Sequence, residues 1–123
     1  MLVYQVCKKI VSSEINPRYL LMKTITIQQK PALIIDVRMP EEYAQGHIEG
    51  SVNIPLPYLM KEVSQIKTYR EVCTETYKDV PTIYVCCASG GRSAVAADML
   101  EQVGIPLVED GGGWQELSCR CTD

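Results

Sequence analysis

The chain alternates between short apolar runs and stretches with helical spacing. Apolar residues recur at intervals of three and four between 58 and 77 and between 93 and 103, which indicates amphipathic helices. Asn16 and Pro17 suit the cap and first residue of another helix, although the β-branched residues at 24–27 weaken that prediction. Shorter helices are expected at 41–45 and after Trp114. Five runs rich in apolar residues are short enough for strands: residues 7–11, 32–36, 51–54, 82–86 and 106–109.

This order of elements predicts an α/β domain. The nearly uninterrupted apolar run at 32–36 is typical of a parallel strand covered on both faces. Five strands with intervening helices predict a central five-stranded, mainly parallel sheet flanked by helices on both faces. A single domain is expected over residues 1–123, with its core at about 7–117. Residues 118–123 show no pattern and are expected to form a mobile tail.

Composition narrows the function classes. Hydrophobic residues make up 46% of the chain and charged residues 22%, which is ordinary for a globular protein. A net charge of −3 without any Lys/Arg cluster argues against a nucleic-acid partner. No apolar run reaches the roughly 20 residues needed to span a bilayer, and residues 1–4 are too short for the core of a signal peptide, so a cytoplasmic protein without a membrane partner is expected. The six cysteines lack zinc-site spacing and are expected to be reduced thiols.

One loop carries the candidate chemistry. The strand at 82–86 is followed directly by Cys87, at the sheet edge where α/β domains bind ligands. A glycine-containing loop can turn several backbone N–H groups towards one anion, and the start of a helix adds partial positive charge. Such a setting favours the thiolate, which is the nucleophilic form of cysteine. The residues that follow Cys87 and form this predicted anion-binding loop are Ala88, Ser89, Gly90, Gly91, Arg92 and Ser93, with the helix expected to begin at Ser93.

Three stretches resemble the signatures of rhodanese-like domains. They are DVRMPEEYAQGHIEGSVNIP at 36–55, CASGGRS at 87–93 and GGW at 112–114, with Ser51 where alanine is more usual. The resemblance implies a rhodanese-like fold and a sulfurtransferase without metal or organic cofactor. Cys87 would take a sulfane sulfur from a donor such as thiosulfate and hold it as a persulfide. Cyanide or a cellular thiol would accept it, and a protein persulfide or thiol could serve as partner.

Two alternatives stay open at this point. Counted from Cys86, five residues precede Arg92, as in cysteine-based phosphatases and arsenate reductases; counted from Cys87, four do, as in sulfurtransferases. The strand pattern continues through Cys86, which favours Cys87 as the nucleophile. The other alternative is a non-catalytic docking module that uses the same fold. Cys119 and Cys121, on the expected tail, are candidate sulfur acceptors.

Several further side chains are assigned by position. Asp36 is a supporting residue that either accepts amide hydrogen bonds from the cysteine loop or caps its own strand. Arg38 and Glu42 have helix-turn spacing and are expected to form a structural ion pair. His47 is expected to make a structural hydrogen bond rather than act as a base. Arg92 binds substrate or braces the loop.

Overall fold

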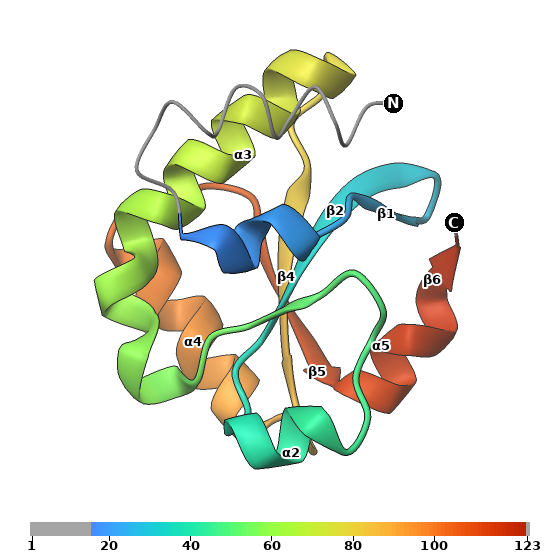
Figure 1. The fold of residues 1–123 in the computed structure, drawn as a ribbon, viewed down its shortest axis with the longest axis vertical. Helices are drawn as coiled ribbons and strands as arrows, with labels where there is room; N and C mark the ends of the chain where they lie inside the picture. The colour runs from blue at the N-terminus through green and yellow to red at the C-terminus, as the bar shows by residue number, and fades with distance from the viewer. Residues whose placement is uncertain (1–15, 123) are drawn as a thin grey trace.

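Helices lie on both faces of a central sheet in the computed structural model of the chain, which describes residues 16–122 (Figure 1). The expected strand at 7–11 and Cys7 lie outside the described residues. In chain order the elements are η1 (Pro17–Leu21), β1 (Ile25–Ile27), β2 (Lys30–Asp36), α2 (Pro40–Ala44), β3 (Val52–Asn53), η2 (Leu56–Glu62), α3 (Val63–Tyr77), β4 (Thr82–Cys87), α4 (Gly91–Gln102), β5 (Val108–Gly113), α5 (Trp114–Arg120) and β6 (Cys121–Thr122).

The sheet of the described region has six strands in the order β5-β4-β2-β1-β6, with β3 paired to β2. The pairs β2–β3, β2–β4 and β4–β5 are parallel, whereas β1 is antiparallel to both β2 and β6. The α/β class is therefore confirmed. Within the described residues β1 and β6 are additional to the four strands predicted there, and they form an antiparallel edge. A two-residue turn explains the antiparallel start, because Gln28 and Gln29 adopt φ values of 53° and 66°, which join the two strands of a hairpin.

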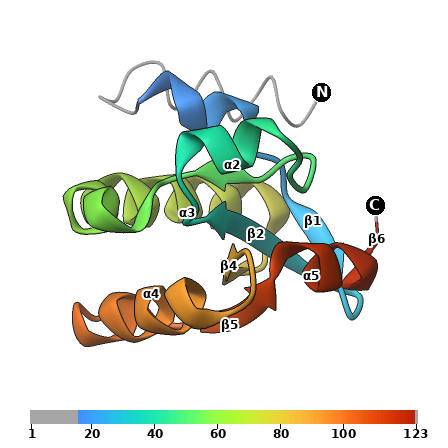
Figure 2. The same cartoon turned by 90° about the horizontal axis from the view of Figure 1, so that it is seen from below.

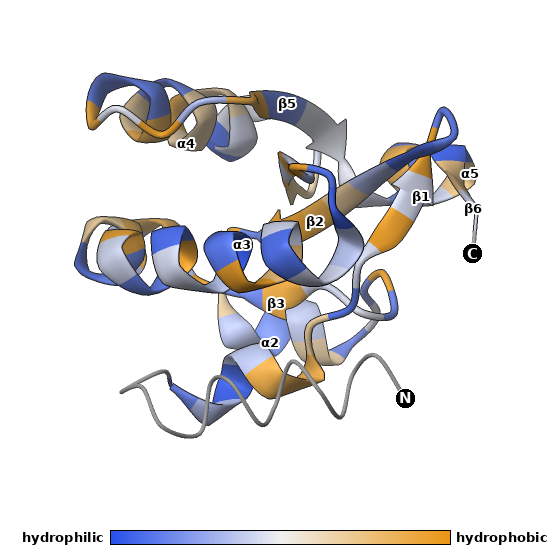
Figure 3. Cartoon of the chain, turned by 90° about the horizontal axis from the view of Figure 1, so that it is seen from above, coloured by the Kyte–Doolittle hydropathy of each residue, from blue (hydrophilic) through white to orange (hydrophobic). Residues whose placement is uncertain are grey.

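Side chains of the central strands β2 and β4 alternate between two cores. One core lies under α3 and α4 (Figure 2), and the other lies under α5. Hydrophobic segments of β1, β2 and β3 gather between the helices (Figure 3), which explains the apolar run at 32–36. The residues of β2 and β4 in the first core are Leu33, Ile35, Ile83, Val85 and Cys87; those in the second core are Ala32, Ile34, Tyr84 and Cys86. The two adjacent cysteines therefore point to opposite faces of the sheet.

Strand β5 differs from its predicted position at 106–109. Leu107 has a φ of 56°, a left-handed conformation that precedes the strand. The strand then includes all three glycines of the segment 111–113, beyond the predicted end at residue 109. Its register with β4 pairs Val85 with Asp110 and Cys86 with Gly112, so Gly111 is the extra residue of a β-bulge. A Cβ at Gly111 would lie 2.8 Å from the side chain of Leu117, so this bulge depends on glycine.

The described part of the expected tail, residues 118–122, contains regular structure. Helix α5 continues through Arg120, and β6 then pairs with β1, with Thr122 opposite Thr26 and Cys121 opposite Ile27. Cys121 also packs against the second core. A two-residue strand leaves no alternation to read in the sequence, so its pairing partner could not be predicted.

The carboxyl ends of the parallel strands meet beside α2 (Figure 1). The backbone N–H of Val37, just after β2, donates to the carbonyl of Cys86 at 2.9 Å, which joins the ends of β2 and β4. No helix within residues 16–122 has the length and apolar character needed to cross a bilayer.

Candidate active site at the end of strand β4

Cys87 is the last residue of β4, and its side chain lies beneath the start of α4. The residue is 1% exposed. Its Sγ accepts hydrogen bonds from the backbone N–H of Gly90 at 3.0 Å and of Ser93 at 3.3 Å. Gly90 adopts a φ of 115°, which only glycine reaches without strain and which lets the chain turn back over the sulfur. The local sequence therefore produces the predicted cradle of main-chain donors.

The cradle favours the thiolate of Cys87. Burial alone raises the pKa of this thiol. Hydrogen bonds from Ser93, through its side chain and backbone N–H, and from the backbone of Gly90 and Ser89 lower the pKa by more, so that the net shift is downward. A buried thiol whose charged form is stabilised by fixed dipoles is a prepared nucleophile. Ala88, Ser89 and Gly91 are exposed on the loop that covers the sulfur.

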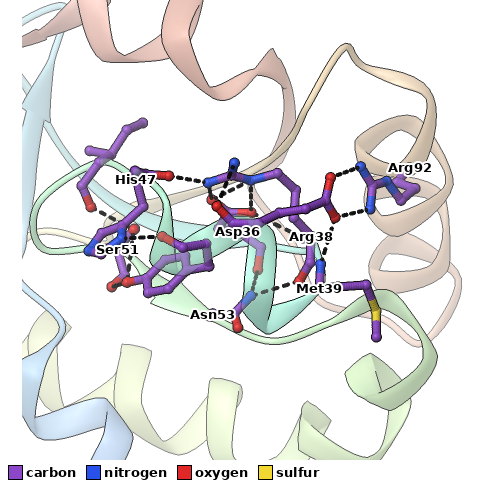
Figure 4. A network of polar contacts seen from close by, with 11 residues as sticks. Asp36, Arg38, Met39, His47, Ser51, Asn53 and Arg92 are labelled. Atoms are coloured by element: carbon purple, nitrogen blue, oxygen red, sulfur yellow. Dashed lines mark hydrogen bonds and ion pairs between the residues drawn. The ribbon is translucent and has the colours of Figure 1, made fainter.

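Arg92 is bound to a carboxylate of α2. Its guanidinium makes a two-pronged ion pair with Glu42 of α2, with Nη1–Oε1 at 2.7 Å and Nη2–Oε2 at 3.0 Å. Glu42 also accepts the backbone N–H of Met39 at 3.0 Å. Figure 4 shows Arg92 reaching from α4 into the polar network beside α2. Of the two roles considered for Arg92, bracing the loop matches this geometry, because its charge is already opposed by a carboxylate.

Asp36 and Arg38 form a buried ion pair at the end of β2. Asp36 accepts the Arg38 guanidinium at 2.7 Å from Nη2 and 3.0 Å from Nε, and also accepts the Arg38 backbone N–H at 3.0 Å. The expected Arg38–Glu42 ion pair is wrong, because each residue has another charged partner; Arg38 reaches only the Glu42 carbonyl, at 3.3 Å. Of the two roles considered for Asp36, organising its own strand end is the one observed, since its carboxylate is bound to Arg38 (Figure 4).

Comparison with known proteins agrees with this geometry. A family model described as the rhodanese-like domain matches residues 22–118. The chain belongs to the rhodanese family. It is 36% identical over 84 residues to the thiosulfate sulfurtransferase PspE of Escherichia coli, covering 68% of this chain and 72% of that protein. It is 37% identical over 95 residues to a putative thiosulfate sulfurtransferase, mitochondrial, of Schizosaccharomyces pombe, covering 72% of this chain and 65% of that protein. The crystal structure of SSP1007 from Staphylococcus saprophyticus aligns with a TM-score of 0.53 at 28% identity, covering 98% of this chain and 95% of that one.

Cys86 has a structural place in this rhodanese-like domain. It is fully buried in the second core, on the opposite face of the sheet from the cradle. Burial raises the pKa of Cys86 well above its usual range, and the Asp36 carboxylate raises it further. A buried neutral thiol cannot attack an oxyanion, which counts against the alternative that starts the phosphatase spacing at Cys86.

His47 and Trp114 also have structural positions in the domain. His47 Nδ1 lies 2.7 Å from the carbonyl of Tyr43, and its ring stacks on that tyrosine with centroids 3.7 Å apart. This confirms the predicted structural hydrogen bond. Trp114 is half-buried, packs against the second core and lies under the Arg38 guanidinium at 4.8 Å.

Sequence reasoning missed Asp110, which reaches the site from β5. Its Oδ1 accepts the Ser93 hydroxyl at 2.7 Å and the backbone N–H of Gly112 at 2.9 Å. Asp110 lies two residues after Val108, which packs in the core under α4, so alternation along β5 places both side chains on that face of the sheet. The strand predicted from the sequence ends at residue 109 and therefore leaves Asp110 outside it. Within residues 16–122, no group of three or more His, Cys, Asp or Glu is arranged to hold a metal ion.

Proposed function

We propose that this protein is a sulfurtransferase in which Cys87 carries a sulfane sulfur as a persulfide. The observation that carries the proposal is the pair of backbone N–H groups, from Gly90 and Ser93, that hydrogen-bond to Sγ of Cys87. These donors stabilise the attacking thiolate, and they can equally stabilise the terminal sulfur anion of a persulfide. Relatives named thiosulfate sulfurtransferase support the same chemistry. The mechanism uses no metal or organic cofactor.

The reaction has two displacement steps. The Cys87 thiolate attacks the outer sulfur of thiosulfate and forms an S–S bond. The sulfur–sulfur bond of thiosulfate breaks, and sulfite leaves with its electron pair. A thiophile such as cyanide then attacks the outer sulfur of the persulfide, takes it as thiocyanate and returns the thiolate of Cys87. Neither step requires an external oxidant or reductant, and the backbone donors stay in place in both.

The charge of the site favours a donor other than thiosulfate. Residues 88–91 contain no cation, and the charge of Arg92 is opposed by Glu42. A dianion that approaches an anionic sulfur therefore meets little compensating charge, so its KM is expected to be high. A persulfide of a small thiol or of a protein carries less charge and suits this loop better.

We assign the protein to the cytoplasm, with no nucleic-acid or membrane partner.

Intact mass spectrometry after exposure to a sulfur donor tests the proposal. The wild-type chain and C86S should each gain about 32 Da, the mass of one sulfur atom, whereas C87S should gain nothing. Thiocyanate production from thiosulfate and cyanide should follow the same pattern. A chromogenic aryl phosphate provides the contrast, since turnover lost in C86S would support the phosphatase reading. Absence of any mass gain in the wild type would favour a docking module and overturn the proposal.

A further inference from the structure

We propose that Asp110 is a positioning residue for the Cys87 nucleophile and acts on it through Ser93. This rests on the proposed function, because it concerns Cys87 as the attacking group. Asp110 lies on β5, and Ser93 lies in the first turn of α4. The Ser93 hydroxyl donates to Asp110 Oδ1 at 2.7 Å, while the Ser93 backbone N–H donates to Sγ of Cys87 at 3.3 Å. The same residue thus connects the carboxylate to the sulfur.

The hydrogen-bond partners of the Ser93 hydroxyl show how the Asp110 carboxylate can hold Ser93 in place. A hydroxyl has one hydrogen to donate, and besides Asp110 its possible acceptors are the Gly90 carbonyl, at 3.0 Å, and the Cys87 sulfur itself. An ionised carboxylate is the stronger acceptor and forms the shorter contact. Ser93 is fully buried, so its side chain is held by these partners rather than by water. Fixing the side chain also fixes the backbone N–H that faces Cys87.

Asp110 ties β5 to the cysteine loop at a second point. Its Oδ1 also accepts the N–H of Gly112 at 2.9 Å, and Gly112 lies in the bulged part of β5. That part of the strand packs closely on the loop: a Cβ at Gly90 would lie 3.9 Å from the Gly112 Cα, and one at Gly113 would lie 3.0 Å from the Ala88 carbonyl oxygen. One carboxylate therefore holds the loop, the helix start and the strand in register.

Direct repulsion between the Asp110 carboxylate and the Cys87 thiolate would change the pKa of Cys87 in the opposite direction. A carboxylate near a thiolate disfavours the thiolate, so loss of Asp110 would lower the pKa of Cys87 if repulsion dominated. Loss of a positioned donor would raise it. Asp110 is exposed, so its long-range repulsion is screened by solvent. The other charged or titratable groups near Cys87 are Arg92 and Cys86, and both remain unchanged in the test.

The test measures the pKa of Cys87 from the pH dependence of its alkylation by iodoacetamide. The tryptic peptide 79–92 separates this cysteine from the exposed Cys119, and fragment ions of that peptide assign the alkylation to Cys87 rather than to the adjacent Cys86. D110A should raise the pKa by about 1, a tenfold shift in the thiol–thiolate ratio. D110N keeps an acceptor oxygen in place and should not raise it. E109A, at the neighbouring exposed acidic residue of β5, is the matched control and should behave as wild type.

The double variant S93A/D110A shows whether the effect passes through Ser93. S93A alone should raise the pKa of Cys87 by at least as much as D110A does, because it also removes the hydroxyl that bonds to the sulfur. The double variant should match S93A rather than add the two effects. An unchanged or lowered pKa in D110A, or additive effects in the double variant, would overturn the proposal. Alkylation detects the thiolate whether or not sulfur is transferred. Failure here is therefore distinct from failure of the mass gain that tests the sulfurtransferase.

Discussion

Replacing Gly90 with alanine tests whether the backbone cradle governs the thiol. Gly90 has φ 115° and ψ −17°, and its N–H is the closer of the two donors to Sγ of Cys87. A Cβ at this position meets nothing nearer than 3.9 Å, so G90A introduces backbone strain without a collision. Gly104, beyond the end of α4, has φ 87° with open space around its Cβ position. G104A therefore introduces comparable strain away from the sulfur.

The expected magnitudes follow from these conformations. A left-handed conformation costs a non-glycine residue about 1–2 kcal/mol. For a domain of this size that corresponds to a fall in Tm of roughly 3–10 °C. If the loop relaxes instead, the Gly90 N–H rotates away from Cys87. A hydrogen bond to a charged group contributes about 1.5–3 kcal/mol. Its loss would raise the pKa of Cys87 by about 1–2.

Two measurements separate the outcomes. Thermal unfolding followed by circular dichroism should show lower Tm values for both G90A and G104A. The pH dependence of Cys87 alkylation should move upward only in G90A, and sulfur loading at neutral pH should slow in that variant alone. If G90A lowers Tm while the pKa of Cys87 stays at the wild-type value, the Gly90 N–H does not stabilise the thiolate. The reasoning for the cradle would then be refuted.

Further predictions concern the two ion pairs beside α2. Asp36 is fully buried, so D36A leaves the Arg38 cation without its carboxylate partner. The free energy of unfolding, measured with urea, should fall by about 3–5 kcal/mol in D36A, and the double variant D36A/R38M should recover part of that loss. E42Q removes the charge opposite Arg92 and should lower the KM for thiosulfate severalfold. The control E41Q, at the exposed neighbouring glutamate, should leave that KM unchanged. An equal KM in E42Q and wild type would show that Arg92 cannot reach the donor. Hydrogen bonds from the Arg92 side chain, and then from backbone, lower the pKa of Glu42 to about 2 from an ordinary 4.5. A depressed carboxyl pKa stabilises the fold above the ordinary value, and this stabilisation is lost as pH falls through 4.5 towards 2. Acid titration of unfolding should therefore show a weaker pH dependence for E42Q across that interval.

Alternation along β4 is the part of the site that the sequence predicts best. Once residues 82–86 are taken as a strand buried on both faces, Cys86 and Cys87 must face opposite sides of the sheet. The glycine at position 90 and the helix pattern after position 93 then place the sulfur of Cys87 under backbone donors. Each of these steps depends on local periodicity and on backbone freedom, and both are determined by residues that are close together in the sequence.

Contacts between distant segments could not be predicted in the same way. Glu42 lies four residues from Arg38, a spacing that suits an ion pair within one helix turn, yet its carboxylate pairs with Arg92, fifty positions away. The start of α2 brings Glu42 to the beginning of α4 only after β2 and β4 have paired. Asp110 likewise meets Ser93 only because β5 pairs with β4 beside α4, and β6 pairs with β1 although 96 positions separate Thr26 from Thr122. Such contacts are products of tertiary packing, which no local pattern encodes.

The two ion pairs explain why this loop relies on main-chain donors. Asp36 and Glu42 each oppose an arginine near the carboxyl ends of β2 and β4, so neither guanidinium is left as a free cation at the sulfur. The positive potential at Cys87 then comes from N–H dipoles whose direction is fixed by the fold. Fixed dipoles stabilise a single anionic sulfur well, but they offset a second approaching dianion less than a mobile cation does. A site built in this way favours holding a persulfide over attracting a highly charged donor, which is the preference that the E42Q variant is designed to reverse.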